Sequence, residues 1–122
     1  MTQNKAQKEA TLNVSVLDDL RKLDRSPRDS VVTELLEAFL SEVPEMMRNM
    51  RSALEAQNIF SIRKQAHALK SNAGNLGADR FAAICQNIEK GPEALLKNLI
   101  EELEAEYRLV AEQMHQQMKK TA

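Results

Sequence analysis

Apolar residues recur along the chain at spacings of three and four, which is the period of one face of an α-helix. The pattern appears in a short stretch after residue 15 and in a long one from about residue 26 to 56. Two medium stretches follow, and a last long one runs from Glu93 almost to the end of the chain. This order, with brief connections, predicts an all-α fold: an antiparallel four-helix bundle with a short additional N-terminal helix.

Helix-capping residues stand at the ends of several of these stretches. Ser15, with Asp18 three residues later, has the spacing of a capping box at the start of the first helix. Ser26 and Pro27 have the residue types expected at the start of the second. Pro44 lies inside the second stretch, so we expect a kink there and not necessarily a break.

The length of 122 residues suits one domain with a single core. Residues 1–12 are polar and carry no helical pattern, so we expect a flexible N-terminal tail ahead of a bundle spanning residues 13–120. A bundle whose four apolar stripes close on one another predicts a monomer.

Composition narrows the classes of function. The formal charge of −1 and the 3% aromatic content argue against a nucleic-acid partner. No apolar run reaches the roughly 20 residues needed to cross a bilayer, and the polar start has no signal-peptide pattern, so we expect a cytoplasmic protein without membrane association. The single cysteine, Cys85, agrees with a reducing compartment and reads as a small core residue.

The sequence AHALKSNAGNLGA, residues 66–78, contains one of the two histidines. At about 100° per residue, the apolar positions of this helix form one buried stripe, and His67, Lys70 and Gly74 lie on its flank with Ser71 beside them. His67 should therefore face water.

These neighbours suit a phosphoryl acceptor. Such a site needs an accessible neutral imidazole, a cation for the phosphoryl oxygens, and little bulk around it. Lys70 supplies the cation one turn from His67. Ser71 and Gly74 leave room above the ring for another protein, although Gly74 could instead mark the end of the helix. A lone helical histidine without neighbours of this kind is usually an ordinary surface residue.

The same residues resemble the signature of the histidine phosphotransfer domains of two-component signalling, usually written HxLKG and followed by small residues and a glycine. The resemblance implies a four-helix bundle in which His67 is phosphorylated and Lys70 stabilises the phosphoryl group. Ser71 departs from the usual glycine. Some members use a Gln or Glu on the next helix to hydrogen-bond the other imidazole nitrogen. The same spacing from the histidine in this sequence implies Glu89 for that role. The alternative is that Glu89 is a solvent-exposed charge without a partner.

The resemblance also implies the partners. The phosphoryl group would come from a receiver-domain aspartate and pass to another receiver, belonging to response regulators or a hybrid sensor kinase. The receiver would bring Mg²⁺, and this chain would need no cofactor or metal. The sequence has no GxxxxGK loop or GxGxxG motif, so we expect no kinase activity of its own.

Two other functions remain open at this stage. One is a helical adaptor that binds receiver domains without taking part in transfer. The other is a metal-binding bundle, because Glu112 and His115 have the ExxH spacing of di-iron sites, although such sites need the pair twice.

Docking would need apolar and charged side chains near the histidine. The apolar candidates are Leu17, Leu20, Met46, Phe60 and Leu76, although each is equally compatible with a place in the core. Arg63 and Lys64 could add positive potential toward an acidic receiver rim, although solvent-exposed charges without a specific role are the simpler interpretation.

Overall fold

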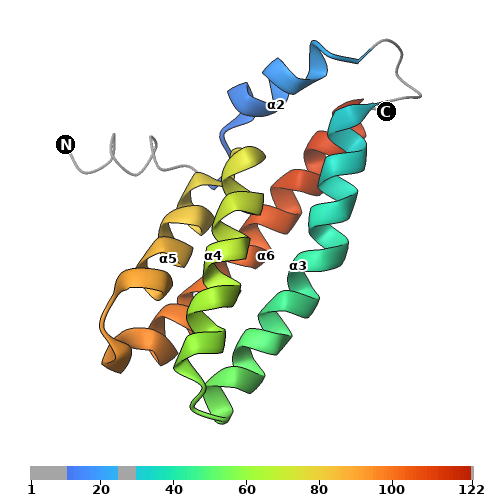
Figure 1. The fold of residues 1–122 in the computed structure, drawn as a ribbon. Helices are drawn as coiled ribbons and strands as arrows, with labels where there is room; N and C mark the ends of the chain where they lie inside the picture. Colours follow the sequence, from blue (N-terminus) through green and yellow to red (C-terminus); the bar gives the residue numbers. More distant parts are fainter. Residues whose placement is uncertain (1–10, 25–29, 122) are drawn as a thin grey trace, which may run out of the picture.

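The computed structural model describes residues 11–24 and 30–121. Around the bundle, α3 packs on α4, α4 on α5, α5 on α6, and α6 on α3. Figure 1 shows these four helices side by side, with α2 at the end of the bundle where α3 begins. The predicted all-α bundle with a short N-terminal helix is confirmed. The elements are α2 (Val14–Arg21), α3 (Val31–Glu55), α4 (Ile59–Asn75), α5 (Asp79–Lys90), the 3-10 turn η2 (Glu93–Leu95) and α6 (Leu96–Thr121).

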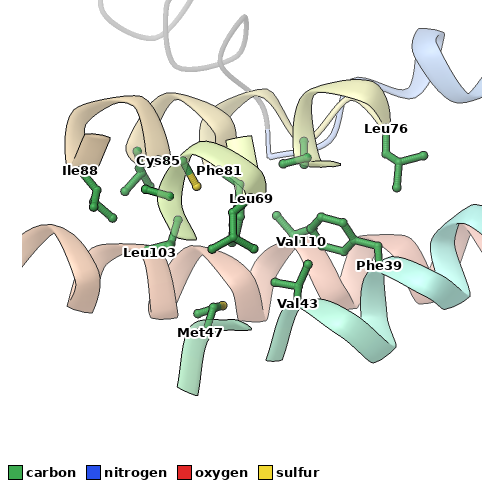
Figure 2. Close-up of a cluster of buried hydrophobic side chains, with 14 of the residues drawn as sticks. Phe39, Val43, Met47, Leu69, Leu76, Phe81, Cys85, Ile88, Leu103 and Val110 are labelled. Carbon is green, nitrogen blue, oxygen red and sulfur yellow. The ribbon is translucent and has the colours of Figure 1, made fainter. Parts of the chain in front are cut away.

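The core lies along the bundle axis and takes side chains from all four long helices (Figure 2). Phe39 of α3 packs edge-on against Phe81 of α5, with ring centroids 5.9 Å apart, and stacks on Tyr107 of α6 at 6.4 Å. Cys85 is fully buried, as predicted for a core residue. Burial raises the pKa of its thiol to about 12, so the thiol stays protonated and unreactive near neutral pH.

Helix α3 passes through Pro44 without a break. Proline has no backbone N–H, so the carbonyl of Leu40, four residues earlier, lacks its usual helical donor. The Tyr107 hydroxyl of α6 donates to that carbonyl at 3.4 Å. A side chain of the neighbouring helix thus replaces part of the hydrogen bonding that the proline removes.

Replacing Tyr107 with phenylalanine should lower the free energy of unfolding by about 0.5–1.5 kcal/mol, the usual worth of one such hydrogen bond. Pro44→Ala restores the missing N–H, so Tyr107→Phe should cost much less in that background. Urea denaturation of the two single variants and the double variant measures this coupling. Equal losses in both backgrounds would show that the hydroxyl does not compensate for the proline.

The starts of α2, α3 and α6 differ from the prediction. Asn13, not Ser15, caps α2: its side-chain oxygen accepts from the Ser15 N–H at 3.2 Å. An asparagine caps as well as a serine, so both Asn13 and Ser15 were possible caps. Ser30 caps α3, accepting from the Thr33 N–H at 3.1 Å.

The predicted start of the second helix, at Ser26 and Pro27, falls outside the described residues. The last helix was expected to begin at Glu93; in the structure residues Glu93–Leu95 form the 3-10 turn η2 and the α-helix begins at Leu96. A tight first turn of this kind is common at helix starts.

The N-terminal segment joins the bundle earlier than the predicted tail of residues 1–12 allows. Thr11 and Leu12 are buried, and the Thr11 hydroxyl accepts from Arg80 of α5 at 2.8 Å. The backbone N–H of Asn13 donates to the carbonyl of Gly77 at 2.7 Å. Gly77 has a left-handed φ of 81°, and a Cβ there would lie 2.6 Å from the Asn13 carbonyl oxygen. Two packed residues were too short a pattern to recognise.

None of the helices in the described ranges is both long enough and apolar enough to cross a membrane.

Candidate functional site

His67 lies on the outward flank of α4, with 65% of its side chain exposed. Its neighbour Ala66 and Leu69 two residues on are fully buried and hold this helix against the core. The predicted orientation of the histidine toward water is therefore confirmed.

Glu89 of α5 contacts the ring from the neighbouring helix. Its Oε2 lies 2.7 Å from His67 Nδ1, and only 14% of its side chain is exposed. An ionised carboxylate can only accept hydrogen bonds, so the neutral imidazole carries its proton on Nδ1. Nε2 then keeps its lone pair and is the nucleophilic nitrogen. The predicted pairing of Glu89 with His67 is confirmed, and its alternative as a solvated charge is wrong.

Lys70 lies one turn beyond His67 and shares the same carboxylate. Its Nζ donates to Glu89 Oε1 at 2.7 Å and to Gln86 Oε1 at 2.8 Å. The ammonium is thus held beside the imidazole by two oxygens of α5. Sequence reasoning missed Gln86, although it precedes Glu89 by one helical turn and so shares its face of α5.

These contacts set the charge of the site. The pKa of Glu89 is lowered, chiefly because Lys70 donates a hydrogen bond to it; partial burial opposes the shift, and the contact with His67 adds to it. The carboxylate is therefore ionised at neutral pH, and it faces one cation and one imidazole.

The lowered pKa of Glu89 predicts a pH-dependent contribution to stability. The pKa of Glu89 in the folded protein is below its unfolded value of about 4.3. The stabilisation by the ionised carboxylate is therefore present above that pH and is lost as the pH falls through the pKa of the folded state. Glu89→Gln should lower the melting temperature at pH 7, with the gap to wild type closing below about pH 4. Thermal denaturation between pH 7 and 3, with the exposed Glu102→Gln as control, measures this. A gap that does not change with pH would contradict it.

The small residues leave the surface beyond the ring open. Ser71 and Gly74 are both exposed, and a Cβ added at Gly74 would meet no atom of the described residues within 4 Å. Packing within the described part of the chain therefore does not require a glycine here. Gly74 is the penultimate residue of α4, where its weak helix propensity matters little.

Arg63 has a structural role that the sequence did not reveal. Its Nη1 donates to the carbonyls of Ile88, Glu89 and Gly91 at 3.2, 3.0 and 2.9 Å. These carbonyls lie at the C-terminal end of α5 and lack helical donors, so the guanidinium caps the helix that carries Glu89. The interpretation of Arg63 as a solvent-exposed charge without a specific role is wrong.

The apolar docking candidates separate by burial. Leu17 and Leu76 are core residues, with 0% and 5% exposure, and Leu20 and Met46 are partly buried. Phe60 is 78% exposed. Only Phe60 of the five offers a whole apolar side chain to a partner.

The predicted metal alternative finds little support in the structure. Glu112 and His115 are both exposed on α6. In the described ranges, no group of three or more His, Cys, Asp or Glu side chains is placed to hold a metal ion.

The bundle and its exposed, carboxylate-paired imidazole with an adjacent ammonium define a phosphoryl-carrier class of protein. The Hpt domain family model matches residues 34–117, well over half of the chain, and includes His67, Lys70 and Glu89. The chain belongs to the Hpt domain family and is a histidine-containing phosphotransfer protein of phosphorelays.

A solved structure agrees with this assignment. The chain is similar to histidine-containing phosphotransfer protein B (HptB) from Pseudomonas aeruginosa PAO1, with a TM-score of 0.80 and 25% sequence identity. The match covers 90% of this chain and 96% of that one. No curated protein matches the chain.

Proposed function

We propose that His67 is the phosphoryl acceptor and that it exchanges the group with aspartates of receiver domains. The observation that carries this is the arrangement of three side chains: the exposed imidazole of His67, Glu89 in contact with its Nδ1, and the Lys70 ammonium on the same carboxylate. The ring is oriented, accessible and next to a cation, which are the requirements of the chemistry.

In the transfer step, the Nε2 lone pair attacks the phosphorus of a receiver's aspartyl phosphate. The N–P bond forms as the P–O bond to the aspartate breaks, and the electron pair leaves on the aspartate carboxylate. Positive charge develops on the ring, and Glu89 stabilises it through Nδ1. Lys70 moves from Glu89 and Gln86 toward the phosphoryl oxygens and stabilises their negative charge.

The partner supplies the phosphoryl donor and the metal ion: the receiver brings the aspartyl phosphate and Mg²⁺. This chain acts as a monomer in the cytoplasm, without a cofactor or kinase activity of its own. The reverse step, with a second receiver or a hybrid sensor kinase, completes the relay. The exposed His67 imidazole can serve both partners because only one occupies it at a time.

The test uses receiver domains encoded by the genome that encodes this chain, each phosphorylated with labelled acetyl phosphate and Mg²⁺. Label should move to this chain as an acid-labile, base-stable phosphoramidate, and mass spectrometry should place it on His67. Label on another residue would overturn the assignment. A receiver that binds without any transfer would indicate the adaptor function instead.

A further inference from the structure

Phe60 is the most exposed of the large hydrophobic residues in the described part of the chain, at 78%. It lies seven residues before His67 on α4, two turns away on the same strip of the helix, or about 10 Å along the axis. We infer that Phe60 is an anchor for the receiver domain that exchanges phosphoryl groups with His67. This inference rests on the proposed function and adds the surface that recognises the partner.

The position of Phe60 relative to His67 supports this role. A specific interface of standard size covers about 800 Å² of each partner, equivalent to a disc of about 16 Å radius. A receiver must bring its aspartate to the histidine, so such a disc is centred near Nε2. Phe60, about 10 Å away along the helix, falls inside it.

Packing within the bundle does not explain the residue. Ile62 and Ala66 are fully buried and provide the core contacts of this part of α4, while most of Phe60 is exposed to water. Docking would remove a large apolar surface from water, and exposed aromatic residues that become buried in this way dominate many interfaces. The protein therefore keeps an aromatic ring where the fold does not need one.

The surroundings of Phe60 indicate the character of the partner surface. The ring borders a shallow hollow of about 530 Å³, whose other lining residues include His67 and the exposed Lys64 and Lys90. Helix α4 has three Arg or Lys residues and no Asp or Glu, and Glu89 is already engaged by Lys70 and His67. A receiver with an apolar side chain beside acidic groups at its active-site rim complements this surface.

The experiment compares Phe60→Ala with Leu109→Ala, which removes an exposed leucine on α6. The receivers of the source genome serve as donors, one at a time. Phe60→Ala should lower kcat/KM for transfer about tenfold, mostly through KM, while Leu109→Ala leaves it unchanged. Labelling of His67 by the small donor phosphoramidate needs no docking and should be the same in both variants and the wild type.

The dissociation constant for unphosphorylated receivers, measured by calorimetry, provides a second readout that does not depend on transfer. Phe60→Ala should weaken binding about tenfold. Unchanged kcat/KM and binding would overturn the docking role. Failure of phosphoramidate to label wild-type His67 would count against the histidine as acceptor, whereas the binding comparison would still decide the role of Phe60.

Discussion

Replacing His67 with glutamine should reduce phosphoryl transfer from a phosphorylated receiver domain to the background level. The substitution removes the nucleophilic nitrogen of the site, because an amide nitrogen is not nucleophilic and the Lys70 ammonium has no free lone pair. The glutamine amide can still donate to Glu89, and the position is largely exposed, so the fold should be unchanged. Transfer is measured with labelled receiver, and folding by circular dichroism.

The second histidine of the chain provides a matched control. His115 is exposed on α6, and His115→Gln makes the same chemical change on another helix. It should transfer at the wild-type rate. Equal transfer by His67→Gln and wild type would exclude His67 as the acceptor, and loss in both variants would point to a general effect of the substitution.

The fold was predictable because the apolar residues that define its helices recur with a regular period. Leu36, Met50, Leu69 and Ile88 each belong to an apolar stripe repeated over several turns, and all four are buried in the structure. The same period predicted the outward direction of His67, since a residue on the flank of a helix, beside its buried stripe, faces away from the core. Features that depend on one or two residues were less predictable. The buried Thr11 and Leu12 are an example, because two positions do not define a period.

The contacts of the site were only partly predictable for a related reason. Glu89 was placed near His67 by the family resemblance, and the 2.7 Å contact confirms it. Gln86 and Arg63 depend on how α4 and α5 are aligned along their axes, which the apolar stripes leave undetermined. Arg63 caps carbonyls on the other helix, and no pattern within α4 indicates that.

Replacing Lys70 with methionine should slow transfer to His67 by about 10–100-fold, the equivalent of losing one hydrogen bond to a charged group. Methionine keeps most of the length and the apolar stem of lysine, so the change removes chiefly the ammonium. Without that cation the negative charge on the incoming phosphoryl group is less well stabilised. Single-turnover kinetics at saturating receiver measures the effect on the chemical step.

Lys64→Met is the matched control, because Lys64 is an exposed lysine on the same helix. It should leave the saturated rate unchanged, and similar losses in both variants would show that only the general positive charge of α4 matters.

The double variant Lys70→Met with Glu89→Gln separates two effects of the ammonium. In Lys70→Met, Glu89 loses the hydrogen bond that contributes most to its lowered pKa, and its charge is left unbalanced beside the incoming phosphoryl group. If neutralising Glu89 restores part of the rate, Lys70 acts in part by masking this carboxylate. If the rate falls further, the hydrogen bond from Nδ1 to the carboxylate outweighs that repulsion, and the direct contact between Lys70 and the phosphoryl group accounts for its role.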